Sequence, residues 1–347
     1  MIINRIKLEN FTVFTNVKID FDHGINIFIG ENGTGKTHLL KVLYSACQCT
    51  DPKISFPYKI VSVMLPDDYN ISRLISRRQG NPRASVRVTA IDELQDSPKN
   101  KLLTAGFCEK NSKWNADVTG EHTWEAAFKG TSSIFIPAKE ILSNSYNLNA
   151  AVEKNNVRFD ATYTDIINAA KIDISVGRNS TAKNKMLSRI QKLIHGKVYY
   201  DAKRDEFYLK NGNSKQEFNL VAEGIRKMAL LWQLIKNGTM EKGSVLFWDE
   251  PEANINPAYA SVIVEMLLEL QRNGVQIFVS THDYMLAAYF DVRKLSSDNV
   301  LFHSLSHNSD TGELRYEHSS SFSDLKNNAV IAAFSKLLDE VSCNIES

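Results

Sequence analysis

The feature that most constrains this chain is a glycine-rich stretch near its start, Gly30-Glu31-Asn32-Gly33-Thr34-Gly35-Lys36-Thr37. It matches G-x-x-x-x-G-K-[ST], the phosphate loop of nucleotide-binding proteins. Glycines let the backbone turn tightly, so that successive N–H groups point at an anion. Lys36 would add a positive charge for the β- and γ-phosphates, and the Thr37 hydroxyl would ligate Mg²⁺. The residues predicted to surround the phosphates are Asn32, Gly33, Thr34, Gly35, Lys36 and Thr37.

The segments on either side of this loop support the same interpretation. Residues 25–29 read Ile-Asn-Ile-Phe-Ile, which predicts a buried strand, and residues 38–46 predict a helix. A phosphate held by the loop would lie at the positive N-terminal end of that helix. The alternative is a glycine-rich turn that matches the pattern by chance, and the strand and helix around it argue against that alternative.

A second nucleotide motif lies far down the chain. Residues 244–248, Ser-Val-Leu-Phe-Trp, are typical of a strand buried on both faces of a parallel sheet, and Asp249-Glu250 follow directly. In open α/β sheets ligands gather at the carboxyl ends of strands. Asp249 is therefore predicted to hold Mg²⁺, and Glu250 to orient and deprotonate an attacking water. An acidic pair at a strand end is common, so this interpretation depends on the phosphate loop.

The segment after the acidic pair predicts one helix and one further strand. Asn256 is a good N-cap, Pro257 suits the first helical turn, and Gly274 ends the helix. Residues 275–279 then form a buried strand, which is followed by Ser-Thr-His-Asp. His282 in that run is expected to contact the γ-phosphate, although a lone histidine is more often a surface or core residue.

Composition and charge exclude some classes of protein. The hydrophobic content of 43% and charged content of 23% are ordinary for a soluble globular protein, and the net charge of +1 favours no particular partner. No apolar run approaches the roughly 20 residues that span a bilayer, and the first residues lack the apolar core of a signal peptide. We therefore expect a cytoplasmic protein without a membrane partner. The cysteines, which show no zinc-ligand spacing and are expected to be free thiols, are Cys47, Cys49, Cys108 and Cys343.

These motifs, taken in order, resemble those of the ATP-binding cassette (ABC) ATPases. Asn-Gly within the phosphate loop, and the continuation Asp-Glu-Pro-Glu-Ala-Asn-Ile-Asn-Pro at 249–257, resemble the branch that holds the structural-maintenance-of-chromosomes (SMC) proteins and the OLD nucleases. Residues 6–11 and 17–21 also resemble the first two strands of that branch. The resemblance implies an α/β P-loop NTPase fold with an ABC/SMC-head-like mixed sheet, and ATP with Mg²⁺ as cofactors.

The signature motif departs from the family. In the proteins that this chain resembles, a Leu-Ser-x-Gly-type loop caps the γ-phosphate of the partner subunit's nucleotide. Here residues 220–227 read Leu-Val-Ala-Glu-Gly-Ile-Arg-Lys, which keeps Gly224 but lacks the serine. We expect backbone N–H groups near Gly224 to contact the anion, with charge added by Arg226 or Lys227. The missing serine makes hydrolysis less firmly implied than binding.

Three parts are expected along the chain. Residues 1–140 form the N-terminal part of the ATPase domain, 141–196 a helical insertion, and 197–347 the C-terminal part with the signature-like motif, the acidic pair and His282. The insertion shows no sustained heptads, so no long coiled-coil arm is expected. After the predicted strand 132–136, Lys139 and Glu140 are weak candidates for a γ-phosphate or water contact, and a surface turn is the alternative. His303 and His307 are interpreted as surface residues.

The resemblance implies a dimeric ATPase switch. Two or more copies would sandwich ATP and control a separate effector protein, and relatives of this kind suggest a setting in anti-phage defence or DNA-related processes. The competing interpretation is an ATP sensor or scaffold that holds an effector without hydrolysis; the motor of a transporter fits poorly.

Nucleic acid is possible as a partner but not strongly indicated, because the basic clusters lack interleaved aromatic residues and each could equally be a solvated face or a site for an acidic partner. The two clusters are Arg73, Arg77, Arg78, Arg83 and Arg87, and Lys183, Lys185, Arg189, Lys192 and Lys197.

Overall fold

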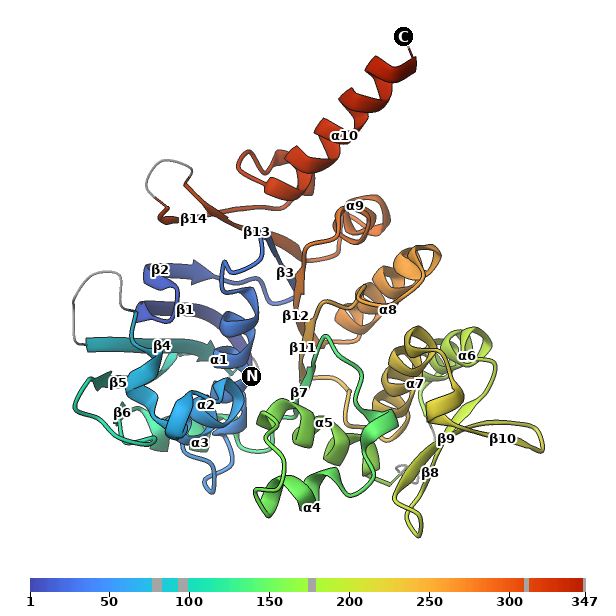
Figure 1. The fold of residues 1–347 in the computed structure, drawn as a ribbon, viewed down its shortest axis with the longest axis horizontal. Helices are drawn as coiled ribbons and strands as arrows, with labels where there is room; N and C mark the ends of the chain where they lie inside the picture. Colours follow the sequence, from blue (N-terminus) through green and yellow to red (C-terminus); the bar gives the residue numbers. More distant parts are fainter. Residues whose placement is uncertain (77–82, 93–98, 174–178, 309–311, 346–347) are drawn as a thin grey trace.

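The computed structural model describes residues 1–76, 83–92, 99–173, 179–308 and 312–345. A six-stranded sheet forms its centre (Figure 1). Its strands are β3 (Ile25–Gly30), β7 (Ser133–Ile136), β11 (Val245–Asp249), β12 (Gln276–Thr281), β13 (Val300–His307) and β14 (Leu314–Ser319). They lie in the order β14-β13-β3-β12-β11-β7, and every neighbouring pair is parallel except β13 with β14.

The middle strands of this sheet are buried from end to end. Every residue of β3, β11 and β12 is buried, as expected for parallel strands that are covered on both faces. Because β3 lies between β12 and β13, the strand that leads into the phosphate loop is inserted between strands from the last part of the chain.

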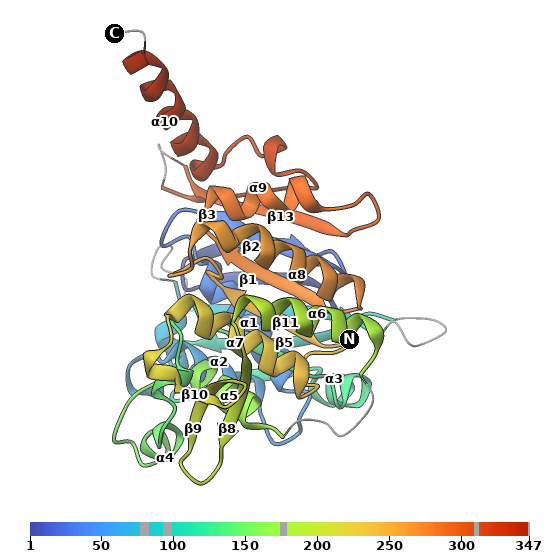
Figure 2. The same ribbon diagram turned by 90° about the vertical axis from the view of Figure 1, so that its right-hand side faces the viewer.

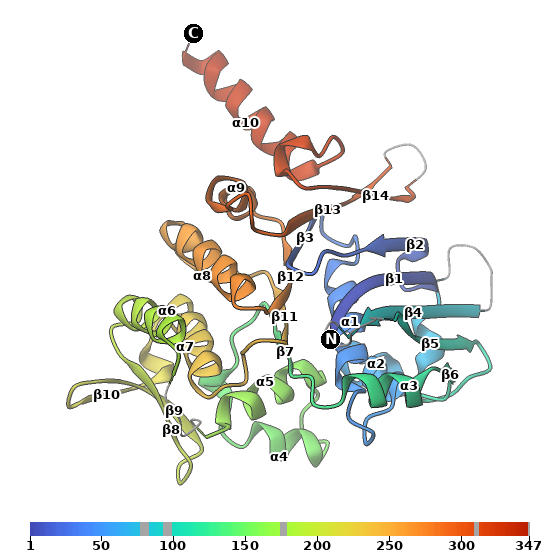
Figure 3. The ribbon, with the colours of Figure 1, turned by 180° about the vertical axis from the view of Figure 1, so that it is seen from behind.

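An antiparallel sheet lies beside one face of the central sheet. Its order is β2-β1-β4-β5-β6, and helix α1 (Lys36–Gln48) lies between the two sheets (Figures 1 and 3). Phe28 and Phe247 of the central sheet share one hydrophobic core with α1 and with this second sheet. The remaining elements on this side are β1 (Ile2–Phe11), β2 (Phe14–Asp20), β4 (Arg83–Ile91), β5 (Lys101–Cys108), β6 (Asp117–Thr119), α2 (Phe56–Met64) and α3 (Glu121–Phe128).

Helices cover the other face of the central sheet (Figure 2). They are α5 (Ala161–Lys171), α6 (Thr181–Leu193), α7 (Glu223–Lys236), α8 (Ala260–Arg272) and α9 (Tyr284–Arg293). The short helix α4 (Leu148–Glu153) lies beside α5, away from the sheet (Figure 1). The helices α5 and α6, from the segment expected to be an insertion, share a single hydrophobic core with α7 and α8. The division of the chain into three parts stays a prediction.

Two smaller features complete the fold. The strands β8 (Lys197–Asp201), β9 (Glu206–Asn211) and β10 (Ser214–Glu217) form an antiparallel sheet just before α7. Helix α10 (Ala329–Ile345) projects from the body beyond α9 (Figures 1 and 2). Short 3₁₀ turns occur at Asp67–Tyr69, Ile71–Leu74, Leu142–Asn144, Phe218–Leu220, Pro257–Tyr259 and Phe322–Asp324. Among the described residues, no helix has both the length and the apolar character that crossing a membrane requires.

The interpretation of His303 as a surface residue is wrong. Its side chain is fully buried, stacks on the Phe28 ring at 4.7 Å between centroids, and lies within hydrogen-bond distance of Asn26 Oδ1 (3.1 Å) and the Tyr316 hydroxyl (3.0 Å). The surface position is predicted from the turn that follows His303. In the fold β13 is an inner strand, with β3 on one side and β14 on the other, so His303 is buried between their side chains. His307, at the end of the same strand, is half-buried.

Candidate active site

The phosphate loop connects the carboxyl end of β3 to the first turn of α1. Gly35 has a left-handed backbone (φ 90°), and a Cβ atom there would lie 2.6 Å from the Val13 and Phe14 side chains, so only glycine fits. Gly33 is also left-handed (φ 82°), with open space where its Cβ would point. The Thr34 hydroxyl donates to the Glu31 carbonyl at 2.9 Å, and Asn32 is exposed. The loop is therefore a closed turn with an open rim, as a phosphate cradle requires.

Lys36 is curled over its own loop. Its Nζ donates to the carbonyl oxygens of Gly30 and Glu31, both at 2.8 Å, and the side chain is buried. Burial lowers the pKa of Lys36, and the carboxylates of Glu250 and Asp249 act in the opposite direction. Phosphate oxygens would take the place of the two carbonyl acceptors.

The two residues predicted to hold Mg²⁺ contact each other. Thr37 Oγ1 donates to Asp249 Oδ1 and Oδ2 at 3.0 and 2.9 Å, and Ser280 Oγ also donates to Asp249. Burial raises the pKa of Asp249, while these two hydroxyl donors lower it. One carboxylate and one hydroxyl fit Mg²⁺, which commonly binds to one or two protein oxygens and takes its other ligands from nucleotide phosphates and water.

Glu250 and His282 also lie together. His282 Nδ1 is 3.4 Å from Glu250 Oε1 and 3.9 Å from Glu252 Oε1. Glu250 has a left-handed backbone (φ 46°), a conformation that costs a residue other than glycine on the order of 1–3 kcal/mol. Its N–H donates to the Ser280 carbonyl at 2.9 Å, which holds the strained turn against β12. The Glu250 carboxylate is partly exposed and can reach water.

Two side chains at this edge, the hydroxyl of Ser280 and the carboxylate of Glu252, were given no role in the sequence analysis. Ser280 binds Asp249 directly, and Glu252 accepts from Thr281 Oγ1 at 2.7 Å and from the His282 N–H at 3.3 Å. Burial raises the pKa of Glu252. The parallel register places Asp249 opposite Ser280, so aligning the two predicted strands by their ends would have found the first contact.

The signature-like segment begins α7 and contacts the loop that follows β11. A Cβ on Gly224 would lie 3.2 Å from the Asn254 carbonyl oxygen, and Lys227 Nζ donates to the Ala253 carbonyl at 2.6 Å. Lys227 is buried, which lowers its pKa. The first turn of α7 is therefore fixed against the residues that carry the acidic pair.

Arg226 forms an ion pair inside its own chain. Its Nε lies 2.8 Å from Glu140 Oε2, as an ion pair rather than an aligned hydrogen bond, and its Nη1 donates to the Phe218 carbonyl at 3.1 Å. The Glu140 side chain is only 1% exposed and also accepts from the Ser143 hydroxyl at 2.8 Å, whereas Lys139 is exposed. The contact of Arg226 with a partner's nucleotide stays a prediction, as do the phosphate contacts of Lys139 and Glu140.

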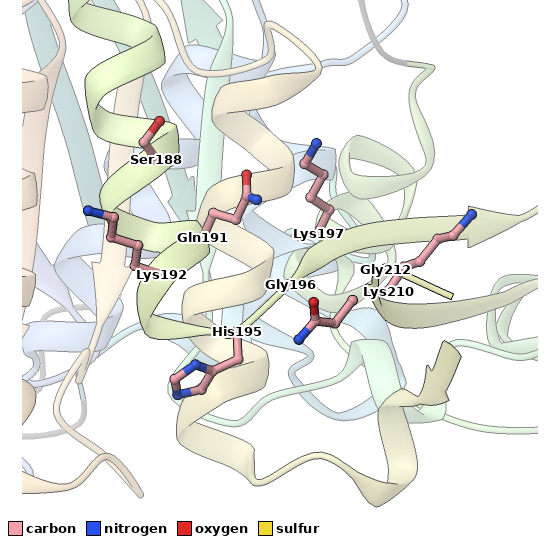
Figure 4. Close-up of a pocket in the computed structure, with 9 residues that line it drawn as sticks. Ser188, Gln191, Lys192, His195, Gly196, Lys197, Lys210 and Gly212 are labelled. Carbon is pink, nitrogen blue, oxygen red and sulfur yellow. The ribbon is translucent and has the colours of Figure 1, made fainter. Parts of the chain in front are cut away.

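The two basic clusters lie in different parts of the fold. Arg73 is in the turn at Ile71–Leu74 and Arg83 and Arg87 are on β4, whereas the second cluster is on α6 and at the start of β8. In the first, Arg77 and Arg78 fall outside the described residues, and Arg87 pairs with Glu9 at 3.4 Å. In the second, Lys192 and Lys197 line a hollow of about 830 Å³ between the end of α6 and the β8–β9 hairpin (Figure 4). Cationic side chains thus surround a hollow that has no part in the nucleotide site.

Comparison with known proteins identifies the class. Residues 1–79 match the family profile described as AAA ATPase domain, and residues 120–288 match the one described as AAA domain, putative AbiEii toxin, Type IV TA system. An SMC head solved in complex with the C-winged helix domain of ScpA superposes with a TM-score of 0.62 at 14% identity, covering 93% of this chain and 99% of that one. The SMC head of Thermotoga maritima superposes with a TM-score of 0.51 at 15% identity, covering 92% and 100%. Motifs, fold and matches together support a P-loop fold of the ABC/SMC-head-like kind with the motifs of AAA ATPase domains, which confirms the predicted resemblance and fold.

Within that class, the curated proteins similar in sequence include the DNA replication and repair protein RecF. The RecF of Pasteurella multocida is 38% identical over 66 residues, which are 19% of this chain and 18% of that protein. The RecF of Lactococcus lactis is 26% identical over 121 residues, 35% of this chain and 31% of that protein. In both cases the match spans less than a third of the relative's length. It therefore supports the shared motifs and does not extend to the activity of the whole relative.

Proposed function

We propose that this chain is a Mg²⁺-dependent ATPase that acts as a dimeric switch and passes its nucleotide state to a separate effector protein. The observation that carries the proposal is the meeting of three strand ends at one edge of the sheet. There Lys36 follows β3, Asp249 ends β11 with Glu250 directly after it, and His282 follows β12. Cation, metal ligands and a carboxylate open to water are what phosphoryl transfer to water needs.

Each group has a separate task in this proposal. Lys36 binds the β- and γ-phosphates, while Thr37 and Asp249 hold the metal, which supplies charge neutralisation between those phosphates. Glu250 orients a water and accepts its proton, because its carboxylate is partly exposed and, unlike those of Asp249 and Glu252, accepts from no hydroxyl among the residues that the structure describes. His282 sits beside Glu250 and donates a hydrogen bond toward the γ-phosphate.

A second copy would complete the site. Gly224 lies at the start of α7, whose free N–H groups suit an anion. Just before it, Leu220 is 70% exposed, an apolar side chain that contact with another copy would cover. Lys227 in the first turn of α7 donates to the loop that follows Glu250. A movement of α7 when two copies close on ATP would therefore change the position of Glu250 in the same copy.

A second candidate function is an ATP sensor that does not hydrolyse. Two observations favour it: Ala222 lacks the hydroxyl of a signature serine, and Arg226 is held by Glu140 within its own chain. In this case ATP would close two copies and hold an effector until ATP leaves. A role in anti-phage defence is proposed from the resemblance alone, and loss of protection against phage in a Lys36→Ala strain would support it.

The substitution Glu250→Gln separates the two functions. It keeps the shape and removes the base, which typically contributes about 10²–10⁴ in rate. We expect ATP turnover to fall by that factor and an ATP-dependent dimer to accumulate in light scattering. Glu109→Gln, at an exposed glutamate far along the antiparallel sheet, is the matched control and should leave both unchanged. Negligible turnover and one oligomeric state in wild type and Glu250→Gln alike would remove the catalytic role and leave the sensor.

A further inference from the structure

Positive charge is concentrated in one part of the fold. Residues 181–217, which comprise α6 and the β8–β10 sheet and are called here the basic lobe, hold nine lysines and arginines against four aspartates and glutamates, a net charge of +5. The whole chain carries +1, so the remainder carries −4. Such an asymmetry marks a surface for an anionic partner more strongly than the overall charge does.

Lysines lie directly opposite one another in this lobe. The register pairs Lys197 with Lys210 and Lys210 with Lys215, which forms a row across all three strands. Directly opposed like charges destabilise a sheet. Lys215 is neutralised by Asp201 at 3.3 Å, but Lys197 and Lys210 form no ion pair with any residue that the structure describes. This row of lysines therefore lowers the stability of the fold unless an anion binds over it.

A hollow of about 830 Å³ lies beside this row. Lys192 and His195 from the end of α6 line it together with Lys197 and Lys210, and its other lining residues are neutral (Figure 4). Lys192, too, has no ion-pair partner in the described part of the chain. In Figure 4 the ammonium groups spread apart along the hollow instead of meeting at one point. This arrangement suits an extended chain with repeated negative charges better than a single small anion.

We propose that the basic lobe docks an acidic segment of a partner protein. Two observations favour a peptide over nucleic acid. The exposed aromatic ring of this face among the described residues, Tyr199, has the Lys215 ammonium 5.1 Å from its centroid, so one face of the ring is already occupied by a cation and is closed to a stacking base. Outside the lobe the chain is net negative, so a long duplex would meet repulsion where a short peptide would not. The proposal rests on the proposed function in one respect, the existence of a separate effector.

Fluorescence anisotropy with a fluorescein-labelled peptide of alternating glutamate and serine tests the docking at physiological salt. We expect the full-length chain to bind it, and the triple substitution Lys192→Ser, Lys197→Ser, Lys210→Ser to weaken binding about tenfold or more, from three exposed ion pairs. The matched control changes three exposed lysines elsewhere to serine, Lys53, Lys110 and Lys129, and should bind as wild type. Because opposed lysines are removed, the triple variant should melt no lower than wild type, which excludes unfolding as the cause.

Three results would overturn the proposal: no binding of the peptide, equal loss in both triple variants, or tighter lobe-dependent binding of a labelled DNA duplex than of the peptide. ATP turnover, measured on the same proteins, should stay at the wild-type rate. Absence of peptide binding by the wild-type chain with intact turnover would thus refute the docking surface alone, and absent turnover in the wild-type chain with intact docking would refute the ATPase alone.

Discussion

Lys36 donates to two carbonyl oxygens of its own loop. Binding exchanges these acceptors for charged phosphate oxygens, which form stronger bonds. We expect Lys36→Ala to weaken ATP binding by at least about 100-fold, since two charge-assisted bonds are worth roughly 1.5–3 kcal/mol each. Isothermal titration calorimetry checks this, with Lys53→Ala at an exposed lysine as control. Wild-type affinity in Lys36→Ala would exclude this loop as the site.

Burial of the Asp249 carboxylate lowers the stability of the folded protein. Its native pKa is raised above the unfolded value of about 3.9, so between the two values the native state binds more protons and the free energy of unfolding falls as pH rises. Asp249→Asn removes this cost. We expect the nucleotide-free variant to melt above wild type at neutral pH, with the difference vanishing near the unfolded pKa, while Mg²⁺ no longer strengthens ATP binding.

Differential scanning fluorimetry across pH checks the Asp249 prediction, and Asp173→Asn at an exposed aspartate is the control. Glu252, whose pKa is also raised, is present in both proteins and cancels in the comparison. A variant that melts lower than wild type at every pH would show that the carboxylate stabilises the fold.

At the scale of single elements, β13 carries a buried titrating group. Burial lowers the pKa of His303 to about 3, against 6.5 when unfolded. At a pH below the pKa of unfolded histidine, the denatured state binds a proton that the buried imidazole of the native state does not bind. The free energy of unfolding therefore decreases as pH falls from about 6.5 toward 3, by up to about 1.4 kcal/mol per pH unit. We expect His303→Gln, which keeps hydrogen bonding without titrating, to lose less stability between pH 6 and about 4.

Urea unfolding at several pH values measures this slope, and His195→Gln, at an exposed histidine, is the control. Equal slopes in wild type and His303→Gln would place the acid sensitivity elsewhere in the fold.

Elements whose signals are local were predictable. The strand before the phosphate loop, the helix after it and the strands ending in Asp249 and before His282 follow from apolar runs and punctuating residues. What depends on register or on distant packing was not. His303 is buried because β13 pairs with β3, Ser280 reaches Asp249 because β11 and β12 align, and Arg226 meets Glu140 across a long stretch of chain. For His303 and Arg226 no spacing in the sequence encodes the contact, whereas the contact of Ser280 could have been found only by aligning the ends of two predicted strands.

At the scale of the whole molecule, the charge distribution limits how tightly and how selectively the chain can bind DNA. With a net charge of +1 and one basic lobe, we expect weak DNA affinity without sequence preference. Since only phosphate contacts would support it, log K should fall linearly with log salt, with a slope of about −0.9 per phosphate neutralised on a duplex. Filter binding over a salt series checks this. A salt-resistant complex that prefers one sequence would reveal a base-reading surface outside the basic lobe.

The position of β3 in the central sheet also governs how the chain is made. Its neighbours β12 and β13 are encoded far downstream, and at about 5–20 residues per second the roughly 250 intervening residues take on the order of 10–50 s to synthesise. Throughout that interval the nascent chain exposes an apolar strand that has no partner to pair with. We therefore expect the nucleotide cradle, although it is synthesised first, to be among the last parts of the molecule to become functional, and we expect the unpaired strand to be prone to aggregation until β13 emerges.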